Sequence, residues 1–234
     1  MCNVFIGYDP RDDLAAKVCE ESLRDHSTVP SLQVHRLNER ELRQKELYWR
    51  SYRVDGVGQM WDDFDGKPFS TQFSFTRFLV PALCGYRAGL SVFCDADFMW
   101  RGDIAEMLDG LEKQKALWCV HHQQRGVVDG ELKMDGVIQT LYHRKNWSSL
   151  MVFDPLLNQA LTPYKVSMWK GSQLHALSWL KDEDIGEIPE TWNWLEGHSD
   201  FNENPKVVHH TRGTPDMIGD DIAFADEWWK YAKR

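Results

Sequence analysis

The first forty residues alternate between apolar runs and an amphipathic segment. Residues 3–8 form a short apolar run typical of a buried strand, and residues 32–37 alternate as a second strand. Between them, apolar residues recur at helical spacing from 14 to 23. Asp9 and Pro10 suit the cap and first turn of that helix, because Asp accepts from free N–H groups and Pro donates none. This order of strand, helix and strand predicts a parallel sheet.

The next part of the chain is polar until an apolar stripe begins near residue 75. Residues 38–70 are irregular and contain several glycines, and they predict a short helix followed by a mobile loop. Residues 75–86 carry a helical stripe that Pro81 is expected to kink, with Arg77 pointing away from it. Residues 90–94 are a short apolar run that predicts a central strand.

The second half contains shorter elements. The pattern predicts a helix over 103–111 capped by Asp103, a strand over 116–120, a polar, Gly-rich loop or hairpin over 126–137, a strand over 150–153, helical segments between 163 and 180, a strand over 206–209 and an amphipathic helix over 222–233. We find no internal repeat, low-complexity run or linker. The chain therefore reads as α/β, with a Rossmann-like, mixed and mainly parallel sheet flanked by helices.

The composition says more about the class of ligand that the protein binds than about its fold. The 234 residues suffice for one core, and a net charge of −9 makes the chain a poor general binder of nucleic acid. A diphosphate ligand would need a cation against this acidic background, which favours a metal. The 11 Trp residues indicate either aromatic surfaces for ring-shaped ligands or a Trp-rich core.

The cysteines and the hydropathy pattern indicate the cellular compartment in which the protein is expected. The count of five cysteines is odd and includes no C-x-x-C pair, which indicates free buried thiols in a reducing compartment. No signal-peptide pattern or membrane-spanning stretch occurs, so we expect a cytoplasmic protein.

Two carboxylates follow the predicted central strand. Asp95 and Asp97 are two residues apart, so in an extended chain they face the same side, while Ala96 faces away and leaves room beside the ligand. Ligands of open α/β sheets gather at the carboxyl ends of strands. Two hard oxygen ligands there suit Mn²⁺ or Mg²⁺, with diphosphate oxygens filling further positions.

A second polar group follows the last predicted strand. His209 and His210 face opposite sides, so we expect one of them to reach the carboxylates as a third metal ligand. Gly213 permits a close backbone approach to a phosphate, and Arg212 would pair with it. Alone, such a His pair is more often structural. Together with the two carboxylates, it favours a metal site.

Four motifs in order carry a family resemblance: F-I-G-Y-D at the start, F-T-R-F-L-V-P before the central strand, F-C-D-A-D-F followed by D-I, and V-H-H-T-R-G-T-P near the end. Together they resemble GT-A glycosyltransferases, in particular the retaining family 8 enzymes, the glycogenin and galactosyltransferase-like group. The resemblance implies a single domain over 1–234, with a nucleotide-binding part over about 1–110 and an acceptor-binding part over about 111–234.

The resemblance also implies roles for individual residues. It implies Asp95, Asp97 and His209 as metal ligands. It places donor-binding residues at Gly7, Tyr8, Asp9 and Arg77, and a sugar- and acceptor-facing segment at Lys145, Asn146, Trp147, Ser148 and Ser149.

The sequence departs from the family pattern at two places. Gln173, where the family often has Asp-Gln-Asp, is flanked by Ser172 and Leu174. Without a carboxylate beside Gln173, retention by front-face displacement, with the leaving phosphate as base, is favoured over a covalent intermediate. The late motif carries Thr214 and Pro215 where the family usually has a phosphate-binding Lys, which leaves Arg212 as a substitute.

Trp192, Asn193 and Trp194 form a further candidate segment. Trp192 would stack on a sugar ring and Asn193 would hydrogen-bond hydroxyls, although a packed corner after Pro189 explains the segment equally well. We take Gln173 and Asn193 as the candidate catalytic residues. His121 and His122 receive no role.

The sequence therefore predicts a metal-dependent glycosyltransferase, of the hexosyl or pentosyl class, that uses a nucleotide-diphosphate sugar such as a UDP-sugar. The acceptor is a hydroxyl of a glycan, a lipid-linked glycan, a protein side chain or a hydroxymethylated DNA base, and the acidic charge disfavours DNA. The alternatives are a phosphatase of the haloacid dehalogenase type, although its motif lies near the N-terminus and does not continue as Phe98-Met99, and a nucleotide-sugar-binding protein without turnover.

Overall fold

A computed structural model describes residues 2–123, 144 and 146–234 of the chain. The loop or hairpin predicted over 126–137, and Lys145, lie outside the described residues. Within those ranges, every helix is too short or too polar to cross a bilayer.

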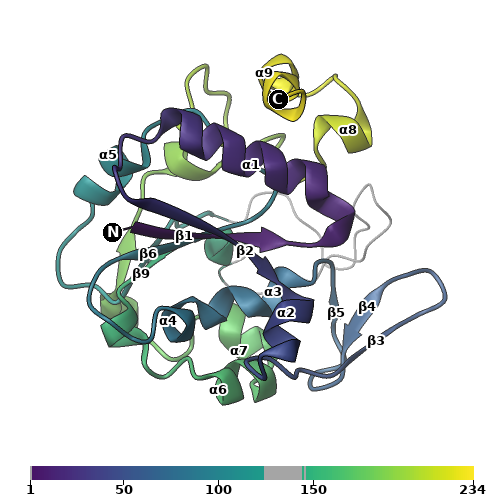
Figure 1. The fold of residues 1–234 in the computed structure, drawn as a ribbon, viewed down its shortest axis with the longest axis vertical. Helices are drawn as coiled ribbons and strands as arrows, with labels where there is room; N and C mark the ends of the chain where they lie inside the picture. Colours follow the sequence, from purple (N-terminus) through teal and green to yellow (C-terminus); the bar gives the residue numbers. More distant parts are fainter. Residues whose placement is uncertain (1, 124–143, 145) are drawn as a thin grey trace.

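The central sheet has six strands and is mainly parallel (Figure 1). The strand order is β10 (Ile185–Glu187), β8 (Leu117–Cys119), β9 (Leu150–Phe153), β6 (Ser91–Cys94), β1 (Cys2–Tyr8) and β2 (Leu32–Asn38). β1 pairs in parallel with both β2 and β6, while β9 runs antiparallel to β6 and β8. The predicted β-α-β opening and mainly parallel sheet are confirmed.

Helices cover both faces of this sheet. α1 (Asp13–His26) lies on one face with α9 (Ala225–Ala232) packed against it. The other face is covered by short helices: α3 (Phe73–Thr76), α4 (Val80–Leu83), α6 (Pro163–Met168) and α7 (Gly171–His175). Asp9 caps the 3-10 turn η1 (Pro10–Asp12) that leads into α1, by accepting from the backbone N–H of Arg11.

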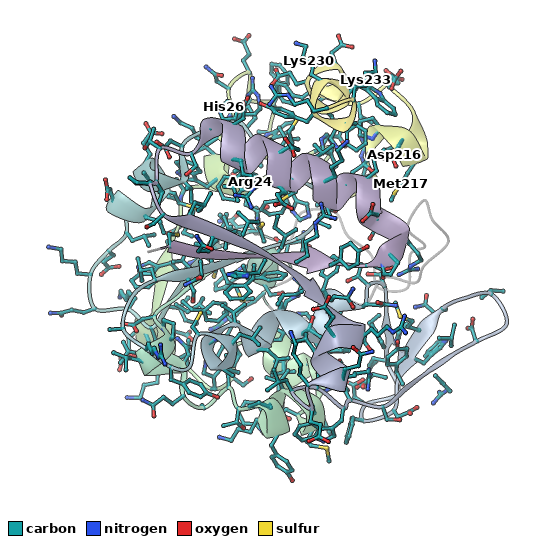
Figure 2. The ribbon with its side chains drawn as sticks, viewed as in Figure 1. Arg24, His26, Asp216, Met217, Lys230 and Lys233 are labelled. Atoms are coloured by element: carbon teal, nitrogen blue, oxygen red, sulfur yellow. The ribbon has the colours of Figure 1, made fainter. Side chains whose placement is uncertain are left out.

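The amphipathic character predicted for the C-terminal helix is confirmed. Trp228 and Tyr231 of α9 are buried, and the Tyr231 hydroxyl donates to Asp25 at the end of α1. Lys230 of the same helix and Lys233 at its C-cap are exposed (Figure 2). α9 therefore buries one apolar stripe against α1 and leaves its charges in water.

The predicted helix over 75–86 is broken just before Pro81. The 3-10 turn η2 (Arg77–Leu79) separates α3 from α4, and Pro81 lies in the first turn of α4. Pro is tolerated at that position because the first N–H groups of a helix have no intrahelical partner.

Residues 38–70 are more ordered than we predicted. After α2 (Glu39–Gln44), the chain forms an antiparallel sheet of β3 (Tyr52–Val54), β4 (Met60–Asp62) and β5 (Pro68–Phe69). The mobile loop expected here is wrong, because a buried ion pair of Arg50 and Asp62 at 2.7 Å and a hydrogen bond from Arg50 to Val166 O tie this sheet to α6.

A third sheet supplies two strands that the sequence pattern missed. It is ordered β11 (Trp194–Leu195), β12 (Val207–His209) and β7 (Phe98–Trp100), and β7 continues directly from Asp97. β12 pairs antiparallel to β7, with His209 opposite Phe98. This pairing joins the chain after the central strand to the late His motif.

The remaining elements are short. They are α5 (Ile104–Asp109), which Asp103 caps as predicted, α8 (Pro215–Ile218), η3 (Trp147–Ser149), η4 (Pro155–Asn158), η5 (Asp182–Asp184) and η6 (Glu190–Asn193).

Candidate active site

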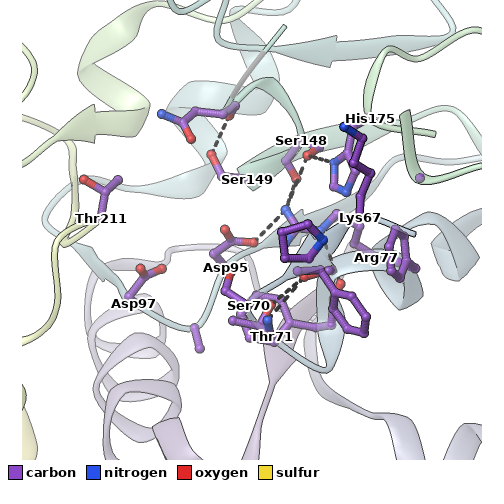
Figure 3. A pocket seen from close by; sticks show the side chains of 18 of the residues that line it. Lys67, Ser70, Thr71, Arg77, Asp95, Asp97, Ser148, Ser149, His175 and Thr211 are labelled. Carbon is purple, nitrogen blue, oxygen red and sulfur yellow. Dashed lines mark hydrogen bonds and ion pairs between the residues drawn. The ribbon is translucent and has the colours of Figure 1, made fainter. Parts of the chain in front are cut away.

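Asp95 and Asp97 lie where the chain leaves the carboxyl end of β6. The Asp95 N–H donates to Ser149 O at 2.9 Å, and the Asp97 carbonyl accepts from His210 N at 3.0 Å, so the backbone is held on both sides. Their side chains are 15% and 32% exposed. Ala96 is buried but lines the same cavity, so the expectation that it faces away from the ligand is not supported. Both carboxylates open into a cavity of about 300 Å³ (Figure 3).

His209, at the end of β12, completes a set of three metal-ligating side chains. One ligand atom each from Asp95, Asp97 and His209 lies within 4.8 Å of the others. His209 Nε2 is 3.3 Å from Asp97 Oδ1. The structure thus places His209, and not His210, beside the carboxylates. His210 is fully buried on the other side of the strand, and burial lowers its pKa to about 4.

Hydrogen bonds orient the His209 ring as a ligand. Nδ1 is 2.9 Å from Asn193 Oδ1, while the Asn193 amide nitrogen donates to Ser149 Oγ, which donates to Asn146 O. Because the Asn193 amide nitrogen donates to Ser149, the amide oxygen of Asn193 faces His209 Nδ1 and accepts its proton in a hydrogen bond. Nδ1 therefore carries the ring proton, and the Nε2 lone pair faces the Asp97 carboxylate. Two electron-rich atoms facing each other suit a cation between them, and two carboxylates with one imidazole fit Mn²⁺ or Mg²⁺.

Arg77 is buried behind Asp95. Its Nη1 lies 3.0 Å from Asp95 Oδ1 and donates to Ser148 O at 2.8 Å, and its Nε donates to Phe73 O. Figure 3 shows these contacts converging at the cavity wall. Arg77 therefore fixes the Asp95 carboxylate. Its expected place near a diphosphate or sugar stays a prediction.

The predicted substrate-facing segment divides between cavity and core. Asn146, Ser148 and Ser149 line the cavity. Trp147 instead stacks on His121, with ring centroids 4.0 Å apart, and donates to His122 O. Trp147 does not line the cavity, and its predicted contact with a substrate stays a prediction.

The two candidate catalytic residues do not line the cavity. Gln173 is exposed and its Oε1 accepts from Lys170 N, so it caps α7, whose cavity-facing side presents Ser172 and His175. Asn193 is fully buried behind His209. Direct contact of either residue with a substrate is not supported, because the helix turn carries Gln173 outward and η6 carries Asn193 inward.

Trp192 and Arg212 also contact other parts of the protein and do not line the cavity. Trp192 is 6% exposed and packs in the core, which corrects the expected stacking on a sugar. Arg212 makes three hydrogen bonds to the buried Glu196 carboxylate, at 2.7, 2.9 and 3.0 Å, and neither Arg212 nor Gly213 lines the cavity. A Cβ added at Gly213 would lie 2.8 Å from the Ile218 side chain, so this glycine permits packing rather than phosphate approach.

Gly7, Tyr8 and Asp9 are not among the residues that line the cavity, and their predicted contacts with a donor stay predictions. A Cβ added at Gly7 would collide with the Phe73 ring, so the glycine lets α3 pack on β1. The Tyr8 hydroxyl donates to Asp13. Asp9 is fully buried; burial alone would raise its pKa, but hydrogen bonds from Arg11 and Gln72 outweigh it and the pKa is lowered.

Several lining residues carried no signal in the sequence. They are Asp12, Asp65, Lys67, Ser70, Thr71, His175 and Thr211. Most belong to the β4–β5 turn and to the segment after it, which reach the site only because the small sheet folds back onto α7.

A comparison with curated proteins places the chain in a family. It is 40% identical over 233 residues to Protein CDI of Arabidopsis thaliana, which covers 96% of this chain and 83% of that protein. The chain therefore belongs to the same family as Protein CDI. No protein-family model matches it.

Solved structures that are similar to this fold include several glycosyltransferases. The galactosyltransferase LgtC, in complex with donor and acceptor sugar analogs, has a TM-score of 0.60 at 13% identity, covering 99% of this chain and 95% of that one. GlyE of Streptococcus pneumoniae has 0.59 at 14%, covering 99% and 60%, and the bifunctional glycosyltransferase WbbM has 0.60 at 13%, covering 99% and 49%. The chain thus spans about half of WbbM. At these identities the similarity shows the fold, which is of the GT-A glycosyltransferase type.

Proposed function

We propose that this protein is a metal-dependent glycosyltransferase that moves a sugar from a nucleotide-diphosphate sugar, a UDP-sugar, to a hydroxyl acceptor. The observation that carries the proposal is the convergence of Asp95, Asp97 and His209 in one cavity. The site lies at the carboxyl ends of parallel strands, where α/β proteins bind nucleotides. Residues 1–110 would bind the nucleotide and residues 111–234 the acceptor.

The three ligands would hold Mn²⁺ or Mg²⁺, which stabilises charge on a departing diphosphate. The chain's own residues prepare the site for that task. Asn193 holds the proton of His209 on Nδ1, and Arg77 fixes the Asp95 carboxylate and partly offsets its charge. Because these partners are in place before a ligand binds, little reorganisation is needed when charge develops.

Retention by front-face displacement is the mechanism we favour, as in the family 8 enzymes that the motifs resemble. The side of α7 that faces the cavity presents Ser172 and His175. The nearby Asp65 carboxylate accepts from the backbone N–H groups of Gly171 and Lys67. Because Ser172 and His175 offer no carboxylate and both oxygens of Asp65 already accept backbone N–H groups, this arrangement supports displacement without a covalent glycosyl–enzyme intermediate, with the leaving phosphate receiving the acceptor's proton. The coupling of the anomeric proton in the product tests it, and an inverted centre would exclude it.

Thermal melting with nucleoside diphosphates, with and without Mn²⁺, tests the proposal. A ligand that binds only the native state raises the melting temperature by mass action. We expect a shift with UDP that requires Mn²⁺ and is lost in Asp97→Asn, which keeps the side-chain size but removes the charge. Asp109→Asn, at an exposed position on α5, is the matched control and should keep the shift. No shift with any nucleotide in the wild type would rule out the proposed donor.

Donor consumption separates an enzyme from a protein that only binds nucleotide sugars. Release of UDP from a UDP-sugar, accelerated by glycan acceptors, is the expected result. Binding without consumption under every acceptor tested would support the alternative without turnover. The similarity of the fold to glycosyltransferases argues against a phosphatase of the haloacid dehalogenase type.

A further inference from the structure

Arg77, which holds the Asp95 carboxylate, is itself held by the η3 turn. Arg77 Nη1 donates to Ser148 O at 2.8 Å and lies 3.0 Å from Asp95 Oδ1. The Asp95 N–H donates to the carbonyl of the next residue of the turn, Ser149, at 2.9 Å. Two successive carbonyls of η3 therefore fix Asp95, one through its backbone and the other through Arg77. A residue that holds η3 in place also holds this proposed metal ligand.

A histidine of α7 holds this turn. Ser148 Oγ lies 3.0 Å from Nδ1 of His175, the last residue of α7. Ser148 is 2% exposed, so its hydroxyl depends on partners within the protein. Figure 3 shows the contacts from His175 to Ser148, and from there through Arg77 to Asp95. The helix α7 contains no acidic residue, and its contact with the proposed metal site runs through this hydrogen bond.

The charge state of His175 suits this contact. The ring lines the cavity and packs against Phe75 and Phe78, with ring centroids 5.9 and 5.3 Å away. Burial first, and then the charges of Arg77 and Arg50, hold the pKa of His175 well below its ordinary value, so the ring is neutral near pH 7. The hydrogen bond to the hydroxyl therefore forms without a second positive charge beside the Arg77 guanidinium.

We propose that His175 is a positioning residue: through Ser148 it fixes the arginine that holds Asp95 in place for the metal. The inference rests on the proposed function, which includes the metal. Removal of the imidazole would leave the buried Ser148 hydroxyl without this partner, and the turn that holds Arg77 would lose this connection to α7. Ligands that are fixed in advance bind a metal more tightly than ligands that must be ordered on binding, so the metal affinity should fall.

Titration of the full chain with Mn²⁺, with and without UDP, tests the proposal when free Mn²⁺ is measured by electron paramagnetic resonance. His175→Leu removes the hydrogen bond, and we expect the Mn²⁺ affinity to fall about threefold to tenfold, less than for a residue that contacts a ligand directly. His175→Asn offers an amide group in the place of Nδ1 and should retain most of the affinity. His198→Leu, at an exposed position that does not line the cavity, is the matched control and should bind Mn²⁺ as the wild type does.

A double-mutant cycle tests the route through Ser148. Ser148→Ala removes the hydroxyl and should lower the Mn²⁺ affinity as much as His175→Leu does. The double variant should lose no more affinity than either single variant, because both substitutions remove the same hydrogen bond.

Each other outcome overturns a defined statement. Unchanged Mn²⁺ affinity in His175→Leu, or additive losses in the double variant, overturns the role of His175 and leaves the glycosyltransferase proposal standing. Equal losses in His175→Leu and His175→Asn would assign the effect to packing of the ring and overturn the route through the hydrogen bond. If His175→Leu does not fold, unchanged affinity in Ser148→Ala overturns the proposal. Failure of the wild type to bind Mn²⁺, with or without UDP, would overturn the proposed function and this inference together.

Discussion

Two of the three candidate metal ligands, Asp95 and His209, are oriented by partners that the sequence pattern does not reveal. Arg77 fixes Asp95, and Asn193 fixes His209 through Nδ1. The Asp pair itself was predictable, because two residues of one strand end necessarily face the same side. The role of Asn193 was not, because it lies 16 residues before His209 and reaches it only through the pairing of β11 with β12.

Replacement of Asn193 should weaken metal binding more than it affects the fold. In Asn193→Leu, Nδ1 of His209 loses its acceptor, so the tautomer with a free Nε2 lone pair is no longer favoured. We expect the apparent Mn²⁺ affinity, measured from the Mn²⁺ dependence of UDP binding, to fall by about 10–100-fold. Asn193→Asp keeps an acceptor at Nδ1 and should retain most of the affinity. Equal losses in both variants would show that Asn193 acts through packing alone.

Among the elements, the small sheet of β3, β4 and β5 differs most from expectation. Its sequence is polar and Gly-rich, which is typical of a loop. The sheet forms because Arg50 pairs with Asp62 and donates to Val166 O of α6 and to Trp169 O at its C-cap. The Arg50 guanidinium also stacks on Phe75, 4.0 Å from the ring centroid. These are contacts between residues up to 119 positions apart, and a local pattern does not contain them.

Breaking this pair should destabilise the protein markedly. Arg50→Met leaves the Asp62 carboxylate buried without its partner, so we expect the free energy of unfolding to drop by about 3–5 kcal/mol. The double variant Arg50→Met, Asp62→Leu removes the stranded charge and should recover part of the loss. Urea unfolding of both variants measures the difference. A double variant no more stable than the single one would contradict the electrostatic explanation.

At the scale of the whole molecule, the fold buries histidines in uncharged form. Burial lowers the pKa of His122 to about 3 and that of His210 to about 4, from an ordinary value of 6.5. In the unfolded chain both would bind a proton below pH 6.5, while in the folded protein they do not until pH 4 or lower. Acidification therefore favours the unfolded state over this range, and stability falls as the pH decreases.

This arrangement predicts a clear pH dependence of stability. Between pH 7 and 5.5, each of these histidines should remove about 1 kcal/mol from the free energy of unfolding. Urea titrations at both pH values measure the change. His210→Leu should reduce the loss of unfolding free energy between pH 7 and 5.5 by about 1 kcal/mol, the contribution of one histidine. An unchanged pH dependence would show that His210 is accessible to protons in the folded state.

The sequence by itself determined the β-α-β opening, the mainly parallel sheet and the Asp95–Asp97 pair. Those features depend on local periodicity and on spacing within one strand end, which the chain encodes directly. The sequence also limited the candidates for the third metal ligand to His209 and His210. The pairing of β12 with β7 then placed His209 beside Asp97.

Only the tertiary structure decided which polar residues surround the cavity. Arg212, Trp192 and Gln173 have the side chains that a sugar or phosphate site needs, yet each is directed to a framework partner or to solvent. Lys67 stands in a segment that resembles a loop, and it reaches the cavity because the small sheet is anchored on α6 and α7. The direction of a side chain depends on contacts between distant segments, and sequence spacing alone does not determine them.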